Sequence, residues 1–270
     1  MNKLYKLIKK KKINKIISYI SKKNLDINIR NKNFLYIIEY AINYNNIKFV
    51  NFLLNKNAKI DFINIEGRTI FYNIIKYKYN NILKLILNHE KLSINIFNLI
   101  DKFKNIPLHY SIIFNNYSAF KLLIDYSNIN LNDLDNNNSL FYSILYNNDK
   151  FIKLICSDKY NINLNNLNNN GNSILHLACI KNFNNIEYIL NKKINYDINI
   201  QQYDTRASSL IIAVLSNNNI IYTSLINYNA DVNIQDNNGN TCFHYAINNN
   251  NYNFLNLYIN KLKNVNVLNT

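Results

Sequence analysis

Residues 236–259 read DNNGNTCFHYAINNNNYNFLNLYI, and this stretch decides the fold. It opens with a turn that contains Gly239, continues with an apolar residue, His244, a variable residue and Ala246, and ends in an apolar stripe. The apolar residues of the stripe fall three and four positions apart, which is typical of one buried face of a helix. The same order recurs upstream as SILHLA at 173–178, IPLHYS at 106–111 and TIFYNI at 69–74.

The small or apolar residue at the Ala246 position marks a repeat that runs through the chain. Successive markers are separated by 33, 33, 37, 32, 35, 35 and 33 residues. A period of about 33 residues with a core of the form T-P-L-H-x-A resembles the ankyrin repeat. The resemblance covers nearly the whole chain, and the markers are Ile8, Ala41, Ile74, Ser111, Ser143, Ala178, Ala213 and Ala246.

The resemblance implies an all-α solenoid of stacked helix–turn–helix repeats with short β-hairpin-like loops. Neither helix of one repeat can bury its stripe alone, so neighbouring repeats must stack to form a continuous core. We expect a single domain over residues 1–270. Its parts are an N-terminal capping repeat at 1–27, repeats at about 28–60, 61–93, 94–130, 131–163, 164–198, 199–232 and 233–263, and a tail at 264–270.

Asparagine stands where the ankyrin pattern has glycine, at the turn between the two helices of a repeat. The chain has 63 Asn but only 3 Gly and 1 Pro, and Asn is the non-Gly residue that best tolerates positive φ. The turn residues are Asn45, Asn115, Asn147, Asn182, Asn217 and Asn250, with Lys78 as the exception. Side-chain oxygens that can cap the first helix come from Thr69, Ser173, Ser208 and Thr241.

Composition excludes several classes of protein. Three Cys cannot build a disulfide framework, so we expect a reducing, intracellular compartment, the cytoplasm, with the nucleus as the alternative. The longest apolar run, residues 210–215, is far shorter than the about 20 residues of a membrane span. The sequence has no Gly-rich phosphate loop and no acid–base pair, so we expect no enzyme and no cofactor. We also expect a monomer.

Three histidines recur at one repeat position, namely His109, His176 and His244. In the ankyrin family this histidine bonds to backbone across the turn and ties neighbouring repeats together. A metal role needs ligands within about 2 Å of one ion, and residues two repeats apart in sequence cannot share one. We therefore expect a structural role and no metal.

Positive charge is concentrated near the N-terminus. The formal net charge is +15, and residues 1–60 hold 14 Lys or Arg against 2 Asp or Glu. Lys9, Lys10, Lys11 and Lys12 form a basic patch of the kind that attracts nucleic acid or anionic surfaces. Because RNA- and DNA-binding motifs are absent, we expect no nucleic-acid partner and rank an electrostatic binder second.

Ankyrin repeats bind proteins through the hairpin tips and the exposed side of the first helix, on the concave face. The resemblance therefore implies a non-enzymatic protein-interaction module, such as a host-interacting or scaffold protein, with a partner that the sequence does not identify. Aromatic residues at these positions either anchor a partner or pack between adjacent repeats. The candidate binding residues are Phe103, Phe114, Tyr146, Leu145, Tyr44, Arg68, Glu66 and Lys102.

Overall fold

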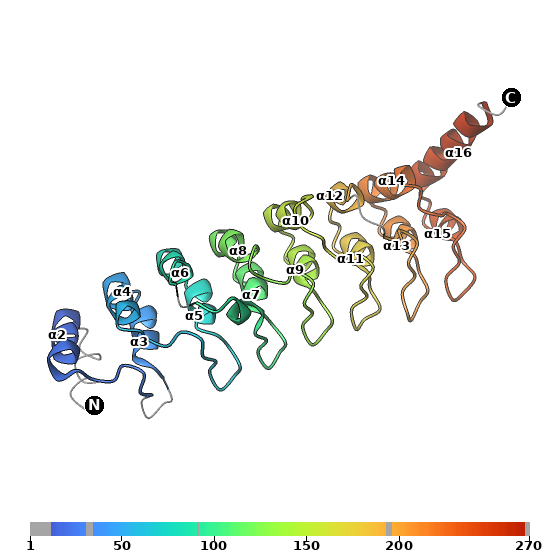
Figure 1. Cartoon of the computed structure of the whole chain (residues 1–270). Helices are drawn as coiled ribbons and strands as arrows, with labels where there is room; N and C mark the ends of the chain where they lie inside the picture. The colour runs from blue at the N-terminus through green and yellow to red at the C-terminus, as the bar shows by residue number, and fades with distance from the viewer. Residues whose placement is uncertain (1–11, 31–34, 91, 193–195, 268–270) are drawn as a thin grey trace. The chain divides into compact units, whose positions relative to one another are not determined.

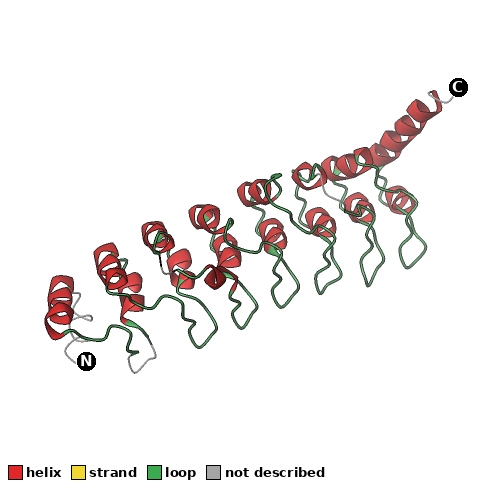
Figure 2. Ribbon diagram, in the orientation of Figure 1, coloured by secondary structure: helices red, strands yellow, loops and turns green. Residues whose placement is uncertain are grey.

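The computed structural model describes residues 12–30, 35–90, 92–192 and 196–267, with only the backbone for 260–267. Short helices alternate with loops along the chain (Figure 2), and the described residues form no strand. Among the described residues, the hairpin-like loops contain isolated antiparallel bridges, Ile63 with Thr69 and Gln201 with Ser208. The chain forms two compact units, residues 1–128 and 129–270, and the fold of each is all-α.

Unit 1 is a stack of helical hairpins behind a leading helix (Figure 1). The first helices of the hairpins contact one another in the order α3, α5, α7, and the second helices in the order α2, α4, α6, α8. The helices are α2 (Ile13–Lys23), α3 (Ile37–Asn43), α4 (Ile47–Asn55), α5 (Phe71–Lys76), α6 (Asn80–Leu87), the 3-10 helix η1 (Ile94–Asn98), α7 (Pro107–Ile113) and α8 (Tyr117–Leu123).

Unit 2 repeats the same hairpin. Here α9, α11, α13 and α15 contact one another in succession, and α14 contacts α16. The helices are α9 (Ser139–Leu145), α10 (Asp149–Ile155), α11 (Ile174–Ile180), α12 (Glu187–Leu190), α13 (Ser209–Leu215), α14 (Asn219–Asn227), α15 (Cys242–Asn248) and α16 (Tyr252–Val267). The first residues of the expected tail therefore belong to the last helix.

The described marker residues lie in the first helices of the repeats and are buried. Ala41 is 1% exposed, Ser143 and Ala246 are fully buried, and the remaining described markers are buried as well. The serine hydroxyl of Ser143 is satisfied within its own helix, because it donates to the Ser139 carbonyl at 2.9 Å. The expected burial of the marker positions is thus confirmed for every marker except Ile8, which lies outside the described residues.

The turn between the two helices has the left-handed backbone that the sequence predicts. All seven turn residues, Lys78 included, have φ between 47° and 57°. After each, the next N–H closes the helix; that of Asn148, for example, donates to the Ser143 carbonyl at 3.0 Å. This is the helix ending that normally uses Gly, so asparagine replaces glycine here as expected.

Helix caps agree with expectation in part. Ser173 accepts the N–H of His176 at 3.3 Å, and Ser208 accepts that of Ile211 at the same distance. Thr69 does not cap: α5 begins later, after Ile70, and no side chain caps its first turn. Thr69 instead holds the base of its hairpin through its backbone bridge.

Candidate functional site

Two hairpin tips of unit 1 are ordered by side chains that hydrogen-bond to the backbone of the same tip. Oδ1 of Asn64 accepts the N–H groups of Glu66 and Arg68 at 2.9 and 3.0 Å. Oδ1 of Asp101 does the same for Phe103 and Asn105, both at 2.9 Å. These hydrogen bonds fix the backbone conformation of each tip, so its side chains project from an ordered loop.

The two tips also contact each other. The Lys102 N–H donates to the Glu66 carbonyl at 3.0 Å. Gly67 has φ 76°, and a Cβ atom there would lie 2.9 Å from the Cα of Asp101. Only glycine allows this close approach, so the tips form one continuous surface.

Charged residues form a network beneath that surface, centred on Arg68. Its guanidinium pairs with Glu66, and its Nε lies 3.5 Å from Oδ2 of Asp101, which is nearly buried. Lys102 Nζ donates to the other Glu66 oxygen at 3.2 Å. This bond from Lys102, assisted by the charge of Arg68, lowers the pKa of Glu66.

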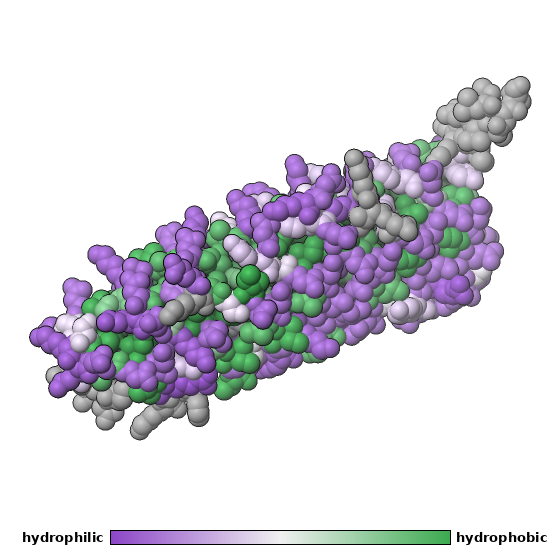
Figure 3. All heavy atoms as spheres, in the orientation of Figure 1, coloured by the Kyte–Doolittle hydropathy of each residue, from purple (hydrophilic) through white to green (hydrophobic). Residues whose placement is uncertain are grey.

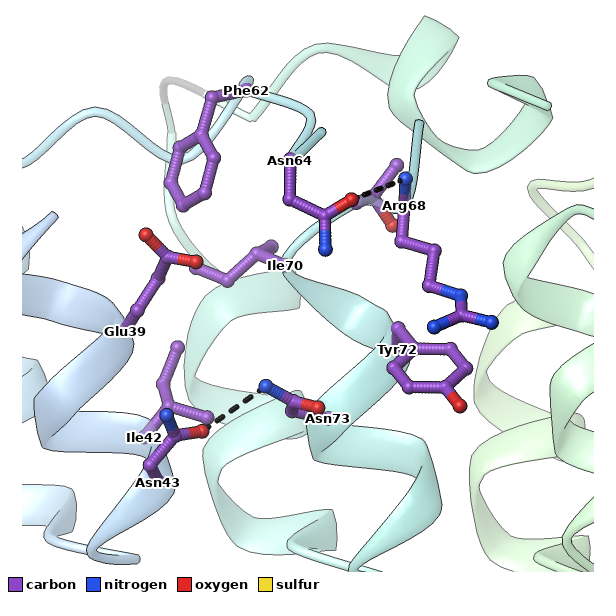
Figure 4. A pocket seen from close by; sticks show the side chains of 10 residues that line it. Glu39, Ile42, Asn43, Phe62, Asn64, Arg68, Ile70, Tyr72 and Asn73 are labelled. Carbon is purple, nitrogen blue, oxygen red and sulfur yellow. Dashed lines mark hydrogen bonds between the residues drawn. The ribbon is translucent and has the colours of Figure 1, made fainter. Parts of the chain in front are cut away.

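Aromatic rings line the adjacent side of α5 and α7. The Arg68 guanidinium lies 4.0 Å from the centre of the Tyr72 ring. Figure 4 shows the two side chains next to each other. Tyr72 meets Tyr110 edge-on at 4.7 Å and Phe114 at 5.7 Å. Tyr110 donates its hydroxyl to Asp101, and burial together with this bond raises the pKa of Tyr110. We call Glu66, Arg68, Asp101, Lys102, Tyr72, Tyr110 and Phe114 the Arg68 cluster.

A small hollow beside the Arg68 cluster is too small for a substrate. It lies between α3 and α5, where Asn73 donates to Asn43 at 3.1 Å (Figure 4). Its volume is about 20 Å³, room for about one water molecule. A hollow of this size has no room for a small-molecule ligand.

Several large apolar residues next to the cluster's members in the sequence are exposed at the tips. Ile65 is 93% exposed and Phe103 44% exposed. Ile63 and Ile100 are each nearly half exposed beside them. On the face drawn in Figure 3, apolar residues reach the surface between polar ones. Exposed apolar groups that gather in this way are typical of a surface that a partner covers.

The structure brings some of the predicted binding residues together and leaves others apart. Glu66, Arg68 and Lys102 join in one network, with the exposed Phe103 next to them. Phe114 is half-buried against Tyr72 and Tyr110, so it packs between adjacent repeats.

The other predicted binding residues stand outside the Arg68 cluster. Tyr44 is exposed directly after α3. Leu145 and Tyr146 belong to unit 2, where Tyr146 is exposed and stacks on Tyr142 at 6.4 Å.

Three residues of the cluster were not predicted: Tyr72, Tyr110 and Asp101. One signal in the sequence could have found the last two. In three repeats an Asp in the tip is followed nine residues later by a Tyr, and each pair is hydrogen-bonded: Asp101 with Tyr110, Asp133 with Tyr142, and Asp236 with Tyr245.

The recurring histidines lie at the start of a first helix. His176 accepts the Ser173 N–H on Nδ1 at 3.0 Å, and its Nε2 lies 3.1 Å from the Ala207 carbonyl of the next repeat. His109 is buried, with Nδ1 3.2 Å from an Asn105 oxygen. His244 accepts the Thr241 N–H on Nδ1 at 3.0 Å and is exposed.

The described part of the chain holds no group of three or more His, Cys, Asp or Glu that could bind a metal ion. The three cysteines are unpaired thiols, and Cys179 and Cys242 are buried. Lys12 is exposed before α2, whereas Lys9, Lys10 and Lys11 lie outside the described residues. None of the helices described is both long and apolar enough to cross a membrane.

Models of ankyrin repeats match residues 37–135, 95–166, 127–202 and 210–257. The chain belongs to the ankyrin repeat family. It is similar to two putative ankyrin repeat proteins of Acanthamoeba polyphaga mimivirus, L371 and L897. The first is 30% identical over 92% of this chain and 33% of its own length. The second is 30% identical over 43% of this chain and 35% of its own length. The chain thus spans about a third of these relatives.

Solved ankyrin structures share the fold. The ankyrin repeat domain of Bcl-3, a member of the IkappaB protein family, has a TM-score of 0.66 at 15% identity, over 77% of this chain and 92% of that one. The ankyrin repeat protein EF0377 has a TM-score of 0.63 at 22% identity, over 73% and 98%. These likenesses establish an all-α ankyrin solenoid, a fold that generally serves protein–protein interaction and is typically non-catalytic.

Proposed function

We propose that this ankyrin repeat protein is a non-enzymatic interaction module that binds a partner protein along its concave face, with the tips of unit 1 as the main contact. The observation that carries the proposal is the apolar surface at those tips, where Ile65 is 93% and Phe103 44% exposed. Covering such side chains contributes about 25 cal/mol per Å² of apolar area removed from water. A scaffold or host-interacting role is one form of this function.

Charge supports an acidic partner. Residues 1–128 hold 22 Lys or Arg against 7 Asp or Glu, whereas residues 129–270 hold 9 of each. Opposite charge on the partner raises the rate of association and selects the orientation in which it docks. Apolar side chains flanked by carboxylates therefore fit the tips of unit 1 best.

Rigidity of the tips also supports the proposal. The side chains of Asn64 and Asp101 fix the two loops, and the Arg68 network ties them together. A surface that is ordered before binding loses little conformational entropy when the partner arrives. Most of the free energy of the contacts therefore contributes to the affinity for the partner.

The test starts with co-purification from the native cell and then measures affinity for the purified partner by calorimetry. Ile65→Ser and Phe103→Ala should each weaken binding about tenfold or more, the size expected for an anchor residue. Ile47→Ser is the matched control, because Ile47 is 44% exposed but lies on α4. Equal losses for Ile65→Ser and Ile47→Ser would contradict the proposal. An affinity that neither variant changes, but that falls steeply between about 50 and 200 mM salt as phosphate-driven binding does, would contradict it as well.

A further inference from the structure

Inside unit 2, polar groups join segments that lie about one repeat length apart at three levels, and not every pair of neighbours uses all three. They lie at the helix start, in the segment before the tip, and at the tip itself. The bonds are His176 Nε2 to the Ala207 carbonyl at 3.1 Å, the Asp231 N–H to Asn199 Oδ1 at 2.9 Å, and the Asn237 N–H to the Thr205 carbonyl at 2.9 Å.

Apolar residues complete this interface on the trailing side of each first helix, which is the side that faces the following repeat. The residue directly after the marker is fully buried in three successive repeats, as Ile144, Cys179 and Val214. On the second helix of the hairpin, Ile226 is 2% exposed. A covered trailing side is therefore the rule in unit 2.

The α15–α16 hairpin carries the same groups, but no described residue covers them. Ile247, which follows the marker Ala246, is 63% exposed, and Ile259, the counterpart of Ile226, is 48% exposed. The polar counterparts are Nε2 of His244, Oδ1 of Asn233 and the carbonyl of Asn238, and nothing in the described residues bonds to any of them. Together these five groups form what we call the trailing face.

We propose that the trailing face of α15 and α16 is a docking surface for one more ankyrin-type repeat, stacked as α15 itself stacks on α13. The occupant must present a carbonyl to His244, a backbone N–H to Asn233, a tip N–H to Asn238 and an apolar helix side to Ile247 and Ile259. The hairpin of α15 and α16 presents the loop N–H, the tip N–H and the apolar helix side to the repeat before it. The α13 repeat presents the carbonyl, that of Ala207, to His176. The surface is separate from the tips of unit 1 and does not depend on the function proposed for them.

Geometry favours this occupant over an unrelated helix. A lone amphipathic helix can cover Ile247 and Ile259, but it has no tip to reach Asn238 and no loop N–H for Asn233. The polar and apolar groups also stand in the same order as in the interfaces already formed within unit 2. The trailing face therefore continues an interface that the molecule builds several times.

The test adds the proposed occupant covalently. In the extended chain, residues 1–260 are followed by residues 228–270, so that the last repeat occurs twice in register. We expect the helical circular dichroism signal to rise and the urea midpoint to shift upward. Ile247→Asp, made in the copy that precedes the added repeat, should cancel that shift, yet leave the midpoint of the natural chain unchanged because Ile247 is exposed there.

Two controls keep the result decisive. Ile65→Asp, at a 93% exposed tip residue, should leave both midpoints unchanged, and Val214→Asp, at a buried one, should lower both. An extended chain without added helical signal, or an Ile247→Asp effect that is equal in both chains, would overturn the proposal. So would a natural chain that forms dimers in sedimentation which Ile247→Asp dissolves, since the face would then be covered by a second copy.

Discussion

A single carboxylate does two jobs in three of the hairpin tips. Oδ1 of Asp133 accepts two backbone N–H groups, from Asp135 and Asn137, at 2.9 and 2.8 Å. Oδ2 accepts the Tyr142 hydroxyl at 2.5 Å. Repeats whose tip carries Asn64 or Asn168 have no Tyr at that distance, and a neutral amide oxygen suffices there. The tyrosine thus accompanies the charge. At Asp101 and Asp133, which are nearly buried, the carboxylate needs donors on both oxygens.

Tyr142→Phe tests this pairing. We expect the free energy of unfolding to fall by about 1–3 kcal/mol, because Asp133 is only 8% exposed and loses a donor. Tyr146→Phe, one turn later and 51% exposed, is the control and should change stability by less than about 0.5 kcal/mol. Urea unfolding measures both. Equal effects would mean that the Asp133 bond contributes nothing.

His176 predicts a pH dependence of stability. Burial lowers the pKa of His176 to about 4, from 6.5 for an ordinary histidine. Between those values the unfolded chain binds a proton that the folded chain does not, so the contribution is complete above pH 6.5 and is lost as the pH falls towards 4.

We expect His176 to account for about 2 kcal/mol of lost stability between pH 7 and pH 5. Unfolding curves over this range measure it, with His176→Gln as the comparison, since glutamine does not titrate. If both proteins lose the same stability, another group is responsible. Protonation also puts a hydrogen on Nδ1, which accepts the Ser173 N–H at 3.0 Å in the folded chain.

At the scale of elements, the extra residues in the longest spacing between repeats form a structured turn. The 37-residue step places extra residues before Asp101, and they form η1. Phe97 of η1 is 1% exposed and stacks between Phe71 at 5.2 Å and Tyr126 at 5.1 Å. The insertion therefore adds to the core of unit 1 instead of lengthening a tip.

Phe97→Ala should lower the free energy of unfolding by about 3–5 kcal/mol, the usual cost of deleting a buried ring. Ile94→Ala in the same turn is the control, because Ile94 is 66% exposed, and should be nearly neutral. Thermal and urea unfolding give both values. A small effect of Phe97→Ala would mean that η1 can detach without loss to the rest of unit 1.

Periodic features were predictable from the sequence, and features that depend on one contact were not. The helical hairpins, the buried markers and the left-handed asparagines follow from residues that recur in phase, as Asn147 and Asn182 do. Arg68 lies over Tyr72 because of the position that one guanidinium takes between two tips. This contact occurs once, so the repeat period of the sequence does not predict it. The prediction that Thr69 caps its helix was wrong for a related reason: α5 starts later than the pattern indicates. The binding role of the predicted residues stays a prediction.

At the scale of the whole molecule, the two units differ in charge. Unit 1 has a formal net charge of +15, and unit 2 has a formal net charge of zero. Like charges within about 10 Å of one another repel unless salt screens them. Unit 1 therefore contains an electrostatic cost of folding that unit 2 lacks.

Salt should stabilise unit 1 selectively. Raising the concentration from about 20 to 200 mM shortens the screening length to below about 10 Å, so we expect slower amide hydrogen exchange in peptides from residues 12–128. Peptides from residues 129–259 serve as the internal control and should not change. Equal slowing in both would point to a general salt effect rather than to relief of repulsion.

The hydrogen bonds that join one repeat to the next have a practical consequence for measurement. Asn98, Asn130, Asn165 and Asn199 each accept a backbone N–H from a residue 30–33 positions further along the chain, at 2.7–2.9 Å. The molecule thus contains its own replicates: one substitution can be made at several equivalent places in a single background. The scatter among those results would measure how strongly local surroundings modify an identical bond, a quantity that usually requires a comparison across different proteins.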